Sequence, residues 1–363
     1  MKIKTLQLDN FRNYASQSFS FDEGLNVIYG KNGAGKTNVL ESVYLLSLFN
    51  SPRTARDKEL VKFGTEKARI KAVIERKYGR RTVLLQIDSA GKKKALVDGL
   101  PVKRAAELIG VLGVVFFSPD EMRLVKETPA ERRRFLDVGL SQQQKSYFIA
   151  LSRYNKTLKQ KNNLLKDVRY AAGTDDMLSV WDAQLAEYGA AVTAARKKYV
   201  AELNSAASKI HSYISGDKEE LVLGYESASV SDDEKEIRTE LAEKITAARE
   251  KDKQLGFCTV GPHRDDISIK INSLDGRKFA SQGQQRTIAL AMKLAEVELY
   301  EKESGDRPVL LLDDVLSELD ENRQKVLLQL TRGAQTLLTC TEYYAGGNAK
   351  KIRVEEGRAD EDK

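Results

Sequence analysis

The sequence predicts a mixed α/β fold interrupted by a largely helical segment, and three patterns support this prediction. An apolar run over residues 25–29 leads into a glycine-rich loop and a helical pattern, which is the order of a strand, a loop and a helix. Residues 68–101 alternate apolar and polar side chains between turn residues, as an antiparallel β-meander does. Residues 120–254 are rich in Ala, Lys, Glu and Gln, and their apolar residues recur at helical spacing.

These patterns divide the chain into two expected domains. Its 363 residues, 41% of them hydrophobic, are enough for two domains or for one large domain with an insertion. We expect a discontinuous α/β domain from residues 1–119 and 255–363, and a mostly helical inserted arm at 120–254. The polar tail, 354–363, is expected to lack regular structure. Within the arm we expect two helix breaks and one short strand, at 173–175, 215–217 and 221–223.

The composition excludes several classes of protein. Cys258 and Cys340 lie far apart without a CxxC pattern, so neither a disulfide framework nor a zinc site is expected. The longest apolar run, 108–117, is about half of what a membrane helix needs, and the first residues lack a leader pattern. We expect a cytoplasmic, nucleoid-associated protein with no membrane partner. The net charge of +7 permits an anionic partner such as nucleic acid without requiring one.

The glycine-rich loop has the complete pattern of a phosphate-binding P-loop, between a strand and a helix as that motif requires. Its glycines let backbone N–H groups turn toward phosphate oxygens, and the following helix directs its positive end at the same oxygens. Lys36 would reach the β- and γ-phosphates, and the Thr37 hydroxyl would bind Mg²⁺. The predicted ATP-binding residues of this loop are Gly30, Lys31, Asn32, Gly33, Ala34, Gly35, Lys36, Thr37 and Asn38.

A second apolar run, 309–312, ends in two carboxylates, Asp313 and Asp314. A buried strand that delivers acids at its carboxyl end is how an open α/β sheet places metal ligands at its ligand-binding edge. Asp313 would hold Mg²⁺, and Asp314 would orient or deprotonate the water that attacks the nucleotide. Lys36, Asp313 and Asp314 are therefore the predicted catalytic residues.

Two further segments produce a resemblance to the ATP-binding-cassette (ABC) ATPases. Residues 281–286, before a strong helical pattern at 287–300, look like the signature motif of that family, and 317–320 look like its D-loop. Local composition alone leaves a second interpretation of 281–286 open, a helix N-cap with a polar loop. The signature residues are Ser281, Gln282, Gly283, Gln284, Gln285 and Arg286, and the D-loop residues are Ser317, Glu318, Leu319 and Asp320.

The resemblance is closer to the SMC and Rad50 branch, whose heads begin with a strand and a short aromatic and basic element, here Asn10–Tyr14. It is closest to the RecF family, because six segments match that family in order over nearly the whole chain. They are Asp57–Leu60, Phe117–Asp120, Ala130–Asp137, Gly261–Asp266, Ser281–Arg286 and Leu311–Asp320.

Membership of this family would imply an ABC-type ATPase head and a recombination mediator. RecF proteins bind ATP with Mg²⁺, dimerise through it, and bind DNA without sequence specificity at gaps or single/double-strand junctions. With RecO and RecR they help to load RecA, and their ATPase is weak and stimulated by DNA. By this resemblance Ser281, Gly283 and Gln284 of one subunit would close on the γ-phosphate held by Lys36 of the other.

The resemblance also assigns residues outside the main motifs. Arg12 and Asn13 would contact the base or phosphates of ATP.

The chain departs from the family pattern at the water-activating position, which usually holds Glu and here holds Asp314. The Asp side chain is shorter by about 1.5 Å of bond length, so we hypothesise slow hydrolysis. The usual switch histidine is absent, and Thr339 and Thr341 are both candidates to replace it; His263 is a further possible switch residue.

Two related classes are alternatives. A transporter-type ABC subunit would have a short interval between P-loop and signature motif, whereas a long helical segment separates Thr37 from Ser281. A Rad50- or SMC-like DNA-structural head would have long heptad repeats, which this chain lacks.

Several basic segments are candidates for DNA phosphate contacts or, equally, for solvated surface. They are Arg76–Arg81, Lys92–Lys94 and Arg132–Arg134. Arg53 and Arg56 would either line the mouth of the nucleotide site or meet DNA. Arg264 would lie with His263 in a loop near the nucleotide or the dimer interface.

Overall fold

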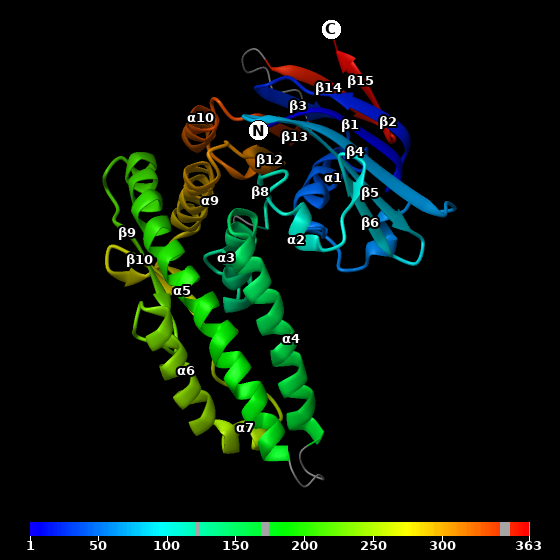
Figure 1. Ribbon diagram of the computed structural model, residues 1–363. Coiled ribbons are helices and arrows are strands. Elements are labelled where there is room, and N and C mark those ends of the chain that lie inside the picture. Colours follow the sequence, from blue (N-terminus) through cyan, green and yellow to red (C-terminus); the bar gives the residue numbers. More distant parts are fainter. Residues whose placement is uncertain (121–123, 168–173, 342–348, 363) are drawn as a thin grey trace. The chain divides into compact units, whose positions relative to one another are not determined.

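The computed structural model describes residues 1–120, 124–167, 174–341 and 349–362, and the chain divides into two units (Figure 1). The first unit is Met1–Arg123 with Ala289–Lys363, and the second unit is Leu124–Ile288. The boundaries predicted from the sequence, after residues 119 and 254, stay a prediction.

A largely parallel sheet forms the part of the first unit that carries the P-loop. Parallel strands buried on both faces need continuous apolar runs, and 309–312 is fully buried. Among the described strands of this sheet, β15 is the one that pairs antiparallel, with β14. The strand order is β15 (Arg358–Asp362), β14 (Lys350–Glu355), β3 (Leu25–Tyr29), β13 (Thr336–Cys340), β12 (Val309–Asp313) and β8 (Val114–Phe117).

An antiparallel sheet forms the other β-layer of the first unit and confirms the predicted meander. One hydrophobic core contains residues of both sheets and of α1 (Lys36–Leu48), the helix that follows the P-loop. The antiparallel order is β2 (Tyr14–Ser20), β1 (Lys2–Phe11), β4 (Lys67–Arg76), β5 (Gly79–Asp88), β6 (Lys93–Val97) and β7 (Leu100–Pro101). The remaining helices described wholly within this unit are η1 (Asp57–Leu60), α2 (Ala105–Leu108), η4 (Val315–Glu318) and α10 (Glu321–Leu330).

The prediction that 354–363 lacks regular structure is wrong, because this segment contributes to β14 and forms β15. Ile352 and Val354 are buried and alternate with exposed polar residues, so β14 has one apolar side and pairs in parallel with β3. A turn at Glu356 and Gly357, both with positive φ, reverses the chain into β15. The prediction began at Val354 and so separated this residue from Ile352, the other apolar anchor of β14.

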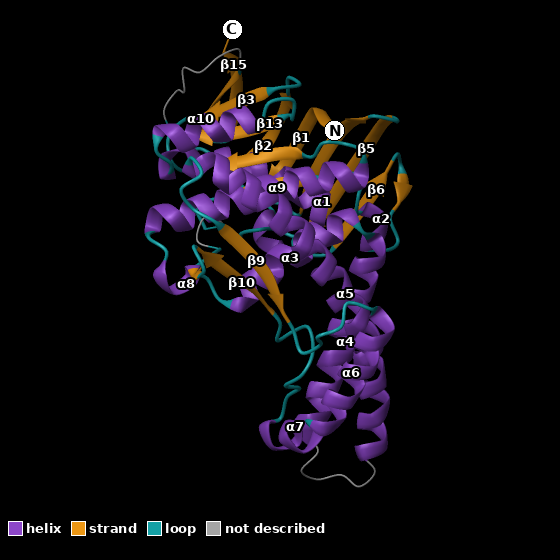
Figure 2. Cartoon of the chain, turned by 90° about the vertical axis from the view of Figure 1, so that its left-hand side faces the viewer, coloured by secondary structure: helices purple, strands orange, loops and turns teal. Residues whose placement is uncertain are grey.

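Helices dominate the second unit, as predicted for 120–254. The long α5 packs against α4 and α6, and Figure 2 shows these three helices side by side. α5 ends at 215 and β9 begins at 221, which agrees with the predicted break and short strand. Residue 173 of the other predicted break lies outside the described residues. The elements are α3 (Pro129–Gln143), α4 (Lys145–Asp167), α5 (Thr174–Ser215), β9 (Leu221–Glu226), α6 (Glu234–Ala247), α7 (Arg249–Leu255), β10 (Asp266–Ile271), β11 (Leu274–Asp275) and α8 (Gly276–Phe279).

Helix α9 (Gln282–Ser304) begins in the second unit and continues into the first. Within the described ranges, no helix is long and apolar enough to cross a lipid bilayer.

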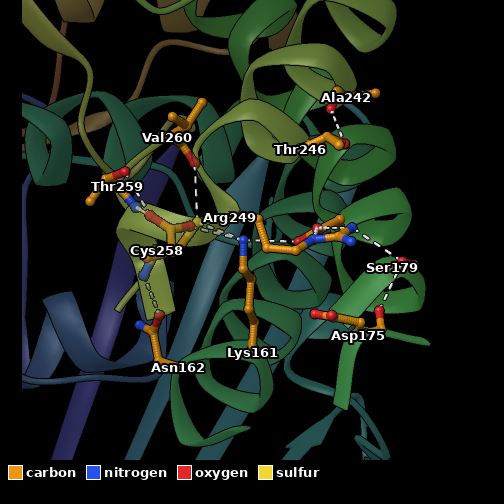
Figure 3. A network of polar contacts seen from close by, with 12 residues as sticks. Lys161, Asn162, Asp175, Ser179, Ala242, Thr246, Arg249, Cys258, Thr259 and Val260 are labelled. Carbon is orange, nitrogen blue, oxygen red and sulfur yellow. Dashed lines mark hydrogen bonds and ion pairs between the residues drawn. The ribbon is translucent and has the colours of Figure 1, made fainter. Parts of the chain in front are cut away.

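A buried network of charges joins the helices of the second unit (Figure 3). The fully buried Lys161 on α4 lies 2.8 Å from Asp182 on α5 and 3.1 Å from Asp252 on α7. Arg249 donates to the other oxygen of Asp182 at 2.8 Å. Asp252 also accepts from the backbone N–H and hydroxyl of Thr259, so the same carboxylate fixes the loop after α7.

We predict that Lys161→Met lowers the free energy of unfolding by about 3 kcal/mol, because it leaves buried carboxylates without their cation. Urea unfolding followed by the fluorescence of Trp181, the single tryptophan, measures the change beside the altered site. Lys159→Met, at an exposed position of α4, is the matched control and should change stability by less than about 0.5 kcal/mol. If the two variants unfolded at the same urea concentration, the buried charge network would not stabilise the second unit as proposed.

Candidate nucleotide-binding site

The P-loop connects the end of β3 to the start of α1, and close backbone approaches require its glycines. Gly30 has a φ of 149°, and a Cβ there would lie 2.2 Å from the carbonyl oxygen of Val354. Gly35 has a φ of 118°, and a Cβ there would lie 2.6 Å from Nδ2 of Asn13. A side chain at either position would displace the neighbouring strand or turn.

The ammonium of Lys36 lies over this loop. Its Nζ donates to the carbonyl oxygens of Gly30 at 2.6 Å and Lys31 at 3.0 Å. Burial lowers the pKa of Lys36, and the charges of Asp314 and Asp313 oppose that shift. The cation is therefore held within the loop, where it would meet the phosphates of a bound nucleotide.

Thr37 and Asp313 lie in direct contact, although they are far apart in the sequence. The Thr37 hydroxyl donates to Oδ1 of Asp313 at 2.8 Å, and the Thr339 hydroxyl donates to the same oxygen at 2.7 Å. Hydroxyl and carboxylate oxygens suit Mg²⁺, which usually takes one or two protein ligands and completes its shell with phosphate and water. The described residues contain no group of three or more His, Cys, Asp or Glu that would form an all-protein metal site. The donor set therefore fits the predicted Mg²⁺ ligands.

The two candidate switch threonines differ in position. Thr339 is buried in β13 and accepts a hydrogen bond from the backbone N–H of Asp314 at 3.0 Å while it donates to Asp313. Thr341 is exposed beyond the end of that strand. Of the two candidate threonines, Thr339 is therefore the one that contacts the acidic pair, and its role as a switch stays a prediction.

Asp314 occupies an unusual backbone conformation directly after β12. Its φ is 51°, in the left-handed region, and the Ser317 hydroxyl donates to its carbonyl at 2.7 Å. Burial and the neighbouring charge of Asp313 raise the pKa of Asp314, while Lys36 lowers it. Shifted carboxylates beside a phosphate site are typical of groups that transfer protons.

The predicted D-loop follows at once. Residues 317 and 318 lie in η4, Leu319 is buried, and Asp320 caps α10 by accepting from the backbone N–H of Arg323 at 2.9 Å. Its role toward a second subunit stays a prediction.

Arg12 lies near the P-loop helix, but its guanidinium is held by a protein carboxylate. Its Nε and Nη2 donate to the two oxygens of Glu41 at 2.9 and 2.7 Å. Glu41 on α1 is buried, and it also accepts from the Ser51 hydroxyl and lies 3.5 Å from Arg53. The predicted ATP contact of Arg12 stays a prediction.

Sequence reasoning missed Glu41. The available signal was a single carboxylate within the apolar pattern that begins α1, a position that needs a cationic partner when buried.

Asn13 contacts the P-loop itself. Its Nδ2 donates to the carbonyl of Ala34 at 2.7 Å, and its Oδ1 accepts from the side chain of Asn38 at 2.8 Å. Gly357, in the turn before β15, donates to the same carbonyl of Ala34 at 3.0 Å. These bonds hold the loop from outside, so its inner face can receive an anion.

The predicted signature residues begin α9 in the second unit. Ser281 and Gln284 form a reciprocal capping box: the Ser281 backbone N–H donates to Oε1 of Gln284 at 2.7 Å, and the Gln284 N–H donates to the Ser281 hydroxyl at 3.2 Å. Gln285 is buried and donates to the carbonyl of Ala280. Gln282 is exposed, and Gly283 and Arg286 are half-buried. The cap interpretation is thus correct locally, and the signature role stays a prediction.

His263 is held inside the second unit. Its Nδ1 lies 2.6 Å from the Tyr154 hydroxyl and its Nε2 2.9 Å from the carbonyl of Cys258. Burial lowers the pKa of His263 to about 4, so the ring is neutral at pH 7. This geometry favours a packing role, and the switch role of His263 stays a prediction.

The basic run 132–134 is largely an internal feature rather than a solvated face. Arg132 is buried and pairs with Asp266 at 2.6 Å, and Arg133 donates to the carbonyl of Asp265 at 2.8 Å. Of the three, only Arg134 is well exposed, at 50% of its side chain. Ion pairs also hold other predicted basic residues, namely Arg76 with Asp306, Arg81 with Asp98 and Lys93 with Asp57.

Comparisons with known proteins agree with this arrangement. A family model described as the RecF/RecN/SMC N terminal domain matches residues 2–352. The DNA replication and repair protein RecF of Agathobacter rectalis is 46% identical over 341 residues, 94% of this chain and 92% of that protein. RecF of Clostridium acetobutylicum is 41% identical over 363 residues, 99% of both chains.

A solved structure of the recombination mediator protein RecF–ATPrS in the RecFOR pathway superposes with a TM-score of 0.94 at 38% identity, covering 99% of this chain and 98% of that one. This superposition confirms the predicted fold class, an ABC-type ATPase head with an inserted arm. The chain therefore belongs to the RecF family of DNA replication and repair proteins.

Proposed function

We propose that this protein is an ATP-dependent DNA-binding recombination mediator. The proposal rests mainly on the contact between the P-loop segment and the acidic pair, in which the Thr37 hydroxyl donates a hydrogen bond to Asp313. The similar RecF structure, described as a recombination mediator with bound nucleotide, supports the same conclusion.

Each group of the site has a role in ATP binding and hydrolysis. The loop N–H groups and Lys36 would hold the phosphates, and Thr37 and Asp313 would hold Mg²⁺. When bound, Mg²⁺ neutralises charge that develops on the phosphate oxygens. Asp314 would accept a proton from the attacking water. Thr339 hydrogen-bonds both residues of the acidic pair, and as the switch residue it would respond to the presence or absence of the γ-phosphate.

The proposal includes an ATP-gated homodimer. Ser281, Gly283 and Gln284 of one subunit would contact the γ-phosphate held by Lys36 of the other. The start of a long helix suits this contact, since its backbone N–H groups and dipole favour an anion. Slow hydrolysis by the short Asp314 would let ATP hold the dimer together as a switch.

DNA would be bound at gaps and single/double-strand junctions, by charge and shape rather than base sequence. The net charge of +7 is compatible with phosphate contacts. With RecO and RecR, the dimer would promote RecA loading in gap repair and replication restart, and DNA would stimulate its weak ATPase.

Sedimentation of the protein with ATP and Mg²⁺, with and without a gapped duplex, tests this function. We expect an ATP-dependent dimer that binds the gapped DNA more tightly than the monomer does. ATP binding without a dimer or DNA retention would contradict the mediator mechanism.

We predict that Lys36→Met weakens ATP binding at least about tenfold, because the phosphates lose a charged donor. Titration with a fluorescent ATP analogue measures the affinity. Lys58→Met, at an exposed lysine of η1, should bind ATP as the unchanged protein does. Normal affinity of Lys36→Met would disprove the assigned site.

We predict that Ser281→Arg still binds ATP but no longer dimerises, because the added bulk and charge would block access to the nucleotide of the second subunit. Sedimentation at low protein concentration with saturating ATP distinguishes the two states. A surviving dimer would refute the composite site.

Asp314→Asn should lower the hydrolysis rate by roughly a hundredfold or more while ATP binding persists, because the amide cannot accept the proton. The raised pKa of Asp314 also gives a pH dependence. The carboxylate acts only when deprotonated, so the rate of the unchanged protein should fall as the pH drops through a value above the ordinary 3.8. A rate that is insensitive to the substitution would exclude Asp314 as the base.

A further inference from the structure

The side chain of Gln284 is fixed by more than its own helix cap. Its Oε1 accepts from the Ser281 backbone N–H, while its Nε2 donates to Oε1 of Glu219 at 2.8 Å. Glu219 lies in the second unit, between α5 and β9, and its side chain is 23% exposed. A residue far from the signature motif in sequence therefore contacts the motif directly.

Glu219 selects one orientation of the Gln284 amide. An amide has a donor end and an acceptor end, whereas a carboxylate only accepts. With Glu219 present, the NH₂ group turns toward the carboxylate and the amide oxygen turns toward the Ser281 N–H. The reversed amide would place donor against donor at Ser281 and acceptor against acceptor at Glu219. The charged partner makes this selection stronger than a neutral bond would.

The fold holds Glu219 in place from two sides. The backbone of Glu220 exchanges hydrogen bonds with Asn272, where β9 and β10 pair at Leu221 and Ile271. Nε2 of the buried His211 on α5 lies 3.6 Å from Oε2 of Glu219. The sheet therefore fixes the backbone beside Glu219, and the carboxylate lies next to the long helix α5.

The resulting arrangement orients the Ser281 hydroxyl so that it can donate a hydrogen bond to a ligand. That hydroxyl accepts from the Gln284 N–H at 3.2 Å, which directs one lone pair into the helix and leaves the hydroxyl proton for donation elsewhere. A donor beside the first turn of α9 is what a γ-phosphate oxygen requires.

We propose that Glu219 is a positioning residue for the composite ATP site: through Gln284 it holds Ser281 and the first turn of α9 in the conformation that receives the γ-phosphate of a second subunit. This inference rests on the proposed ATP-gated dimer, and it adds a residue that lies outside every motif of the sequence.

The test compares Glu219→Ala, Glu219→Gln and the matched control Glu220→Ala, whose exposed side chain neighbours the site. Sedimentation with ATP and Mg²⁺ measures the dissociation constant of the dimer, and titration of dilute protein measures ATP affinity. We expect Glu219→Ala to weaken the dimer about tenfold with ATP affinity unchanged. Glu219→Gln should restore the dimer in part, because its amide oxygen can accept from Gln284 but carries no charge. Glu220→Ala should behave as the unchanged protein.

A double-mutant cycle separates positioning from general damage. Gln284→Ala should itself weaken the dimer, and Glu219→Ala should add little to that loss, since Glu219 acts through Gln284. Additive effects, a normal dimer in Glu219→Ala, or a failure of Glu219→Gln to restore it even in part would each overturn the inference. If the unchanged protein forms no dimer with ATP, the proposed function fails first, and that result appears before any substitution is made.

Discussion

The hydrogen bond from Thr37 to Asp313 is the contact on which the nucleotide site depends. It joins the start of α1 to the end of β12, and it brings two oxygens that suit one Mg²⁺ into contact. The parallel register makes this possible, because β13 lies between β3 and β12 and pairs Thr339 with both Asp313 and Ile28. The P-loop and the acidic pair therefore leave the sheet at the same edge.

Neighbouring elements hold this edge rigid from outside. Asn13 and Gly357 both bond the carbonyl of Ala34, so the β1–β2 turn and the β14–β15 turn support the same point of the loop. The buried carboxylate of Glu41 holds Arg12 and approaches Arg53. A buried charge is stable only with such partners, so Arg12 and Arg53 are positioned jointly rather than independently.

Buried charge pairs organise the second unit in a similar way. Lys161 with Asp252, Arg132 with Asp266 and Arg196 with Asp137 fix the segment around the Gly261–Asp266 block, and Arg196 also donates to the carbonyl of Pro262. The family-matching blocks 130–137 and 261–266 are thus bonded to each other. Their matching sequence reflects a shared internal structure, and His263 belongs to it as a neutral, buried ring.

The sequence by itself determined the P-loop, the acidic pair, the meander and the helical segment, because each depends on local spacing and periodicity. Comparable local signals identified the capping residues Ser281 and Gln284. Tertiary structure alone decided which oxygen Thr37 contacts, that Thr339 rather than Thr341 bonds Asp313, and that Arg132 is internal. It also ordered the tail through the pairing of β15 with β14, which itself pairs with β3, and it placed Glu41 and Glu219 beside their partners. These contacts join residues distant in sequence, and only the packing of sheets and helices brings such residues within hydrogen-bonding distance.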